Sequence, residues 1–132
     1  MTKQEKTQYT LKKDRYVKVR GGNSHFLDIY CAKCSQHIVL YQKDGPGSLL
    51  RMYLDRILEP QHLLSILQNK EKKAVSLKCS NCGLLIGTPV IYERENRPAF
   101  RLIRGSFVKM RSDGTYPPSH RDPGGGNDEC QN

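Results

Sequence analysis

Two cysteine pairs are the feature that most constrains how this chain can fold. Cys31 and Cys34 enclose two residues, as do Cys79 and Cys82, and 44 residues (35–78) separate the pairs. A C-x-x-C turn places two sulfurs on one side of a tight loop, so two such turns supply enough thiolates to close a tetrahedral zinc shell. The sequence therefore predicts one structural Zn²⁺ ion, bound by these four cysteines.

The surroundings of the cysteines favour metal binding over disulfide formation. Residues 1–6 are polar and lack the apolar segment of a secretory signal. No stretch reaches the roughly 20 apolar residues that span a bilayer. We therefore expect a cytoplasmic protein with no membrane partner, in a reducing compartment where C-x-x-C pairs bind metal. Two disulfides are the alternative interpretation of the same spacing.

Composition indicates a small core and an anionic partner. Apolar residues make up 36% of the chain, and a core that small is the situation in which a metal ion stabilises a fold. The formal net charge is +9. A field of that sign attracts polyanions such as RNA, DNA or acidic protein surfaces.

The charge is uneven and divides the chain into three parts. Residues 1–20 hold seven Lys or Arg against two Asp or Glu, whereas residues 112–132 hold one against four. Residues 1–15 lack periodicity and predict a flexible basic arm, and residues 112–132 predict a disordered acidic tail rich in Pro and Gly. Between them, residues 16–111 are expected to form a single zinc-stabilised domain.

Strands are predicted on both sides of the first cysteine pair. Residues 16–20 alternate with period two and favour a first strand. Residues 25–30 run directly into Cys31, and residues 36–42 return from the pair with many β-forming side chains. The result is a hairpin with the metal at its tip.

A second set of strands is predicted around the second pair. Residues 84–92 favour a strand with a bulge or bend at Gly87, and residues 99–110 its return strand. Residues 49–58 fit both a helix and a strand, and a strand is favoured. The predicted fold is mainly β (small α+β): two zinc-knuckle β-hairpins form an antiparallel sheet, with a short helical insertion near residues 60–69.

The residues around the two pairs resemble the zinc β-tent group. His37 follows the first pair, Gly83 follows the second, and Gly105 and Phe107 lie on the predicted return strand. The group includes the Yippee and cereblon C-terminal domains and, more distantly, methionine sulfoxide reductase B. The resemblance spans roughly residues 25–110. It implies a tent of two hairpins around one zinc ion and no particular function.

The chain also departs from the members of that group. It has no Trp, whereas the cereblon-type ligand pocket is a cage of tryptophans, so a pocket of that kind is not expected. The reductase needs a nucleophilic cysteine, and the one spare thiol is Cys130. Its neighbours Asp128 and Glu129 should weaken its thiolate character. An enzyme of the methionine sulfoxide reductase B type is therefore a remote alternative.

Other catalytic groups are not indicated. A catalytic zinc ion keeps an open coordination position, and four cysteines leave none. The remaining candidate ligands are His25, His37, His62 and His120. His37 lies three residues after Cys34 and is either a contact of a zinc sulfur or an ordinary strand residue. We expect no enzymatic activity and no small-molecule substrate.

Six basic residues gather on the last predicted hairpin: Arg94, Arg97, Arg101, Arg104, Lys109 and Arg111. Arginines bind phosphates and interleaved aromatic side chains stack on bases, so this hairpin is a candidate surface for RNA or single-stranded DNA. Alternation along a strand places Arg101 and Arg104 on opposite faces, which breaks the stripe. The first hypothesis is a protein-interaction adaptor or regulator, and nucleic-acid binding is its alternative.

Overall fold

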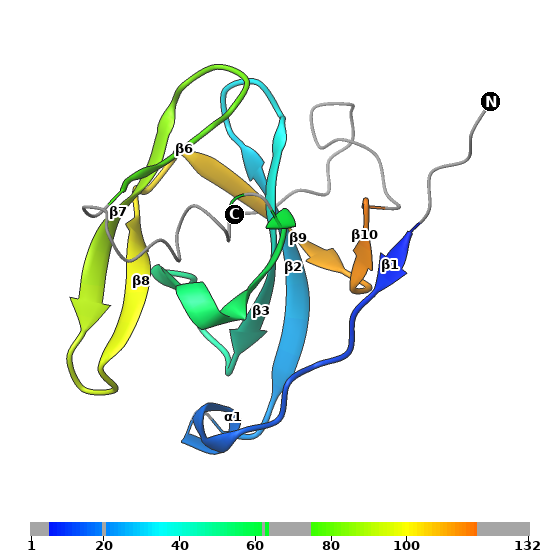
Figure 1. The fold of residues 1–132 in the computed structure, drawn as a ribbon, viewed down its shortest axis with the longest axis vertical. Coiled ribbons are helices and arrows are strands. Elements are labelled where there is room, and N and C mark those ends of the chain that lie inside the picture. The colour runs from blue at the N-terminus through cyan, green and yellow to red at the C-terminus, as the bar shows by residue number, and fades with distance from the viewer. Residues whose placement is uncertain (1–5, 20, 62, 64–74, 119–132) are drawn as a thin grey trace.

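The computed structural model describes residues 6–19, 21–61, 63 and 75–118, which form a mainly β fold (Figure 1). The fold consists of two four-stranded sheets and one two-stranded sheet. All strand pairs described in these sheets are antiparallel. The fold class predicted from the sequence is confirmed, although the two knuckle hairpins lie in two sheets rather than in one.

The first sheet is built around the hairpin that holds the first cysteine pair. Its strands, in spatial order, are β5 (Ile57–Glu59), β3 (His37–Asp44), β2 (Ser24–Cys31) and β9 (Phe107–Ser112). The two central strands each bury six consecutive residues. Side chains on successive residues point to opposite faces, so both faces of this hairpin are covered.

The second sheet holds the second cysteine pair. Its strands, in spatial order, are β4 (Arg51–Tyr53), β8 (Arg97–Leu102), β7 (Leu85–Tyr92) and β6 (Leu77–Lys78). A register shift between β6 and β7 makes Ile86 an extra residue in β7. The bulge or bend predicted at Gly87 is therefore a bulge, one residue earlier in the chain.

One apolar core joins the two sheets. The first sheet contributes Leu27, Ile29, Val39, Tyr41 and Ile57, and the second contributes Met52, Leu77, Ile86 and Phe100. Cys31 and Cys79 belong to the same buried cluster. The apolar core therefore reaches the candidate metal ligands, so core packing and the geometry of the cysteines depend on each other.

A short helix replaces the first predicted strand. Residues 16–20 were expected to extend, but α1 (Arg15–Val19) is helical and buries only Val17. The carboxylate of Asp14 accepts a hydrogen bond from the backbone N–H of Tyr16 at 3.0 Å, and its carbonyl accepts one from Val17 at 3.1 Å. A capping Asp and the absence of a partner strand for these described residues outweigh a short period-two pattern.

Residues 49–58, whose pattern fits both strand and helix, form two short strands around a 3₁₀ turn, Leu54–Arg56. β4 belongs to the second sheet and β5 to the first, so the chain crosses between sheets at this turn. The strand that the sequence favours is therefore present on both sides of the 3₁₀ turn, in β4 and in β5. Most of the helix predicted near residues 60–69 lies outside the described residues.

The predicted return strand over residues 99–110 is wrong as a single element. β8 ends at Leu102, and the chain turns through Gly105, whose φ is +86°. The hydroxyl of buried Ser106 donates to the carbonyl of Ile103 at 2.7 Å and closes the turn. β9 then pairs with β2 in the other sheet. Because apolar residues lie on both sides of this turn, the sequence pattern of the two strands looks like that of one continuous strand.

The two ends of the described chain lie side by side (Figure 1). β1 (Thr7–Gln8) and β10 (Thr115–Tyr116) pair with each other. A second small core is formed by Phe26, Leu40 and Leu58, with Tyr9, Leu11 and Tyr116 packed against it. The described parts of the segments that the sequence assigns to an arm and a tail therefore contact the sheets.

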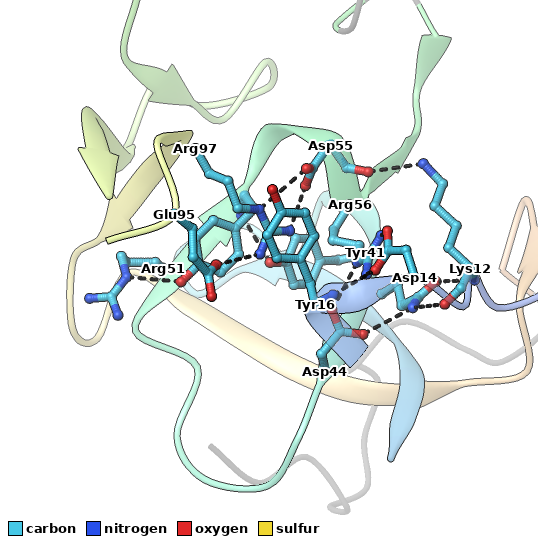
Figure 2. A network of polar contacts seen from close by, with 12 residues as sticks. Lys12, Asp14, Tyr16, Tyr41, Asp44, Arg51, Asp55, Arg56, Glu95 and Arg97 are labelled. Carbon is cyan, nitrogen blue, oxygen red and sulfur yellow. Dashed lines mark hydrogen bonds and ion pairs between the residues drawn. The ribbon is translucent and has the colours of Figure 1, made fainter. Parts of the chain in front are cut away.

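A buried arginine fastens the N-terminal segment to the sheets (Figure 2). Arg56 is 1% exposed. Its guanidinium donates to both carboxylate oxygens of Asp14 at 2.8 and 3.1 Å, and to Oδ2 of Asp44 at 2.9 Å. Removing a cation from water costs several kcal/mol, so a buried arginine needs such partners. The pairing ties the residue that caps α1 to the 3₁₀ turn between the sheets.

A second buried arginine ties α1 to the second sheet (Figure 2). Arg97 donates to Asp55 at 2.7 and 3.3 Å and to Glu95 at 2.9 Å. Its Cζ lies 3.7 Å from the ring centroid of Tyr16 and 3.9 Å from that of Tyr53. Such cation–π contacts are stronger when the cation is removed from water. Because Tyr16 lies on α1, the helix is held to both sheets through arginines.

Substitutions of Arg56 and of Asp14 should lower the free energy of unfolding by very different amounts. Arg56→Ala leaves the carboxylate of Asp44, 4% exposed, without its cation, so we expect a loss of about 3–5 kcal/mol in the free energy of unfolding. Asp14→Asn changes a side chain that is 43% exposed and leaves the Arg56–Asp44 pair intact. Its cost should not exceed about 1 kcal/mol. Urea unfolding at pH 7 measures both values.

The pH dependence of the stability loss in Asp14→Asn tests whether the ion pair with Arg56 causes that loss. The hydrogen bond from Arg56 holds the pKa of Asp14 below its ordinary value. The contribution of Asp14 is therefore complete above about pH 4 and disappears as the pH falls through the lowered pKa. The stability difference between wild type and Asp14→Asn should vanish over that range. A difference that grows in acid would contradict the assignment.

Candidate metal centre

The four predicted ligands come together between the two sheets. The first pair lies in the turn from β2 to β3 and the second in the turn from β6 to β7. Sγ of Cys31 lies 3.6 Å from that of Cys82, and Sγ of Cys34 lies 3.6 Å from that of Cys79. All four Sγ atoms lie within 4.8 Å of one another. Each short contact joins one sheet to the other.

These distances fit one tetrahedral metal ion. Zinc–sulfur bonds of about 2.3 Å give sulfur–sulfur edges of about 3.8 Å in a tetrahedron. The two short contacts of 3.6 Å are near that edge. Four cysteine sulfurs are the donor set of structural zinc sites, and tetrahedral S₄ sites take zinc or iron. The four cysteines can therefore hold one metal ion, as predicted.

The two turns share one backbone pattern. The N–H of Cys31 donates to the carbonyl of Gln36 at 2.8 Å, and the N–H of Cys79 donates to the carbonyl of Leu84 at 2.9 Å. Both bonds join the first cysteine of a pair to the residue five positions later. The two knuckles therefore repeat the same local hydrogen bonding.

Backbone N–H groups also point at the first sulfur of each pair. Lys33 N–H donates to Sγ of Cys31 at 3.3 Å, and Asn81 N–H donates to Sγ of Cys79 at 3.3 Å. The two knuckles therefore share this backbone contact to the first sulfur of each pair as well.

A residue in the left-handed backbone conformation closes each turn. Ser35 has φ +69° and Gly83 has φ +81°, and each donates its N–H at 2.9 Å to the carbonyl of the first cysteine of its pair. Glycine adopts this conformation without steric cost, whereas serine does not. The first knuckle therefore carries backbone strain that the second avoids.

The thiols differ in how readily they ionise. A hydrogen bond from the side chain of Asn81 lowers the pKa of the Cys34 thiol to about 6. For Cys82, the hydrogen bond from Leu84 lowers the pKa, but burial and the three neighbouring sulfurs outweigh it and raise the pKa to about 11. Cys34 therefore forms a thiolate easily, whereas burial and hydrogen bonds with the neighbouring sulfurs keep Cys82 protonated. A bound divalent cation would replace such protons, so metal binding and loss of the thiol protons are coupled.

The structure assigns His37 to the strand. Its Nε2 lies 2.8 Å from Oδ1 of Asp28, a carboxylate that is buried in β2. Its ring packs edge-on against Tyr30, with ring centroids 5.2 Å apart. His25 is half-buried on β2. His62, His120 and Cys130 lie outside the described residues.

The six basic residues come from two sheets and their loops. Arg94 lies in the turn after β7, Arg97 and Arg101 on β8, Arg104 in the following loop, and Lys109 and Arg111 on β9. Arg97 is enclosed by its ion pairs and aromatic contacts, so it cannot face a partner. The remaining five are distributed over two different sheets and their loops.

Sequence reasoning missed the role of Arg56, the most deeply buried cation of the described chain. Its signal was a charged side chain within the largely apolar segment 49–58, which also holds Arg51 and Asp55. Its partners, Asp14 and Asp44, lie 42 and 12 residues away in the sequence. Partners at such distances leave no local pattern in the sequence.

Comparisons with models of protein families, with curated proteins and with solved structures gave no match. Within the described ranges, no helix is both long and apolar enough to cross a membrane. The assignment of the centre therefore rests on the geometry of its four cysteines.

Metal analysis tests the centre directly. We expect about one zinc ion per purified chain, and Cys79→Ser should lose both the metal and cooperative unfolding, because metal binding and folding are coupled in such sites. Elemental analysis with thiol titration measures the first, and thermal unfolding the second. Cys130→Ser is the matched control and should keep both properties. A metal content near zero with all thiols reactive would contradict the assignment.

The strain at Ser35 predicts opposite effects in the two knuckles. Ser35→Gly should raise the free energy of unfolding by up to about 1 kcal/mol, because glycine tolerates positive φ. Gly83→Ala should lower it by about the same amount. A Cβ at Gly83 would meet nothing within 4 Å, so backbone conformation is the expected cause. Unfolding of the metal-loaded protein measures both, and changes of the same sign would refute this account.

Proposed function

We propose that this chain is a zinc-stabilised protein-interaction module, an adaptor or regulator that acts in the cytoplasm and carries no catalytic activity. The observation that carries the proposal is the cluster of four cysteine sulfurs within 4.8 Å. Four thiolates occupy every position of a tetrahedral ion, so no position remains for a reactive water molecule. The metal then holds two sheets together, and function belongs to the surface that they present.

Exposed aliphatic side chains support a protein partner. Leu50, Ile91 and Ile103 are 60%, 57% and 37% exposed. The centres of protein interfaces are apolar and poor in charge. A single-strand binding surface instead combines a basic track with aromatic platforms. The basic residues come from two sheets and their loops, and Arg97, one of the six, is buried.

Nucleic-acid binding is the second candidate. It is favoured by the net charge of +9 and by four exposed arginines: Arg94, Arg101, Arg104 and Arg111. Contacts with phosphate would be strongest at low salt. The buried Arg97 is no longer part of this candidate surface.

The resemblance to zinc β-tent domains is supported by two hairpins that meet at four cysteines. It adds no partner and no substrate. The reductase alternative stays remote, because all four cysteines of the described chain belong to the cluster.

Affinity capture from the native organism tests the proposal when it is combined with nuclease. Tagged full-length chain should retain a defined protein after treatment with RNase and DNase, because the contact is between proteins. Mass spectrometry of the eluate, with Cys79→Ser as the misfolded control, measures this retention. Loss of all partners on nuclease treatment, or capture equal to that of the control, would refute the proposal.

A salt titration tests nucleic-acid binding, the second candidate function, independently. Oligouridine, single-stranded DNA and duplex DNA are titrated into the metal-loaded chain at increasing salt concentrations. Phosphate binding predicts an affinity that is measurable at low salt and falls steeply as salt rises. Undetectable binding at the lowest salt concentration eliminates nucleic acid as the partner.

A further inference from the structure

A groove of about 410 Å³ lies beside the turn that takes the chain from β8 to β9. Its apolar lining comes from Leu49, Leu50, Leu102 and Phe107, and its charged lining from Arg104 and Lys109. Leu102 belongs to the second sheet and Phe107 to the first. The groove is therefore formed jointly by both sheets, at a point where the chain passes from one to the other.

The charge of the groove has one sign. Two cationic side chains line it, and no Asp or Glu is among its lining residues. Leu50, on its border, is 60% exposed. Concave sites of a few hundred Å³ that combine apolar walls with a few polar groups are typical of ligand-binding pockets. A complementary ligand must therefore offer an apolar group together with negative charge.

The lining distinguishes between the two kinds of anionic macromolecule. Three of the four apolar lining residues are leucines and one is aromatic. Nucleotide bases are bound by stacking on aromatic rings, and several such platforms follow a basic track. Aliphatic walls instead fit an aliphatic or aromatic side chain inserted from a partner protein. The lining therefore favours an acidic peptide over a single strand of nucleic acid.

We propose that this groove binds an acidic peptide segment of a partner protein, with a large apolar side chain against Leu50, Leu102 and Phe107, and carboxylates beside Arg104 and Lys109. The inference rests on the proposed protein-interaction function and names its surface and the chemistry of its partner. Exposed charge pairs are screened by salt, whereas the apolar contact is not. Binding should weaken with salt and still persist at high salt.

Selection from a random twelve-residue peptide library on immobilised full-length chain tests the proposal without knowledge of the partner. Enriched peptides are expected to combine a Leu, Ile or Phe with at least two flanking acidic residues. Anisotropy titration of an enriched, labelled peptide then gives its Kd. An absence of enrichment, or enriched peptides without acidic residues, would overturn the proposal.

Two pairs of matched variants locate the contact. Leu50→Gln and Ile91→Gln remove aliphatic side chains of nearly equal exposure, 60% and 57%. Arg104→Gln and Arg94→Gln remove exposed charges from the groove and from a distant turn. The two groove variants should each raise Kd by about fivefold to tenfold, and the two controls by less than about twofold. Unchanged zinc content and melting temperature confirm that all four are folded. Equal effects in both members of a pair would refute the groove.

Two further measurements separate this proposal from the function on which it rests. Oligouridine is titrated into the same variants, and nucleic-acid binding that is lost only with the groove variants would replace the peptide assignment. The nuclease-resistant capture experiment is repeated with Leu50→Gln and Arg104→Gln. A partner retained equally by wild type and by both variants would refute the groove and leave the proposed function standing. A wild-type chain that captures no protein would refute the function itself.

Discussion

Contacts between sulfurs from different sheets are the constraint on which this fold depends. Each of the two sheets that the sulfurs join has four strands, some of only two or three residues, and apolar residues make up 36% of the chain. The shared core reaches Cys31 and Cys79, so the buried apolar cluster ends at the metal ligands. A metal ion bound there also closes a loop of 44 residues (35–78), which restricts the unfolded chain and makes a small core sufficient.

Two buried arginines hold the polar N-terminal segment against the sheets. Arg56 pairs with Asp14, while Arg97 lies against Tyr16. Asp14 directly precedes α1 and Tyr16 lies on it, and this helix buries only Val17. Charge-assisted hydrogen bonds from Arg56 and a cation–π contact of Arg97 therefore supply the attachment that apolar burial supplies elsewhere in the molecule. The same contacts explain why Arg97, which resembles a nucleic-acid ligand in the sequence, is unavailable to a partner.

The sequence predicted the features that depend on local pattern. The two cysteine pairs, their flanking strands and the mainly β class follow from side chains close together in the chain. One error was local, because the capping Asp14 made residues 15–19 helical in spite of their period-two pattern. The other errors occurred where distant contacts decide the outcome. Pairing with β2 separated residues 107–112 from the preceding strand. Partners of Arg56 lie as far as 42 residues away, so no local periodicity predicts its burial.

One of those errors bears on function. An uninterrupted strand over residues 99–110 would place Arg104 with Leu102 and away from Lys109, on the opposite face. The turn at Gly105 and Ser106 instead brings Arg104 and Lys109 into one groove, with walls from both sheets. The cysteine cluster joins the same two sheets, and so does the apolar core. The groove and the candidate metal site therefore depend on the same arrangement of the sheets.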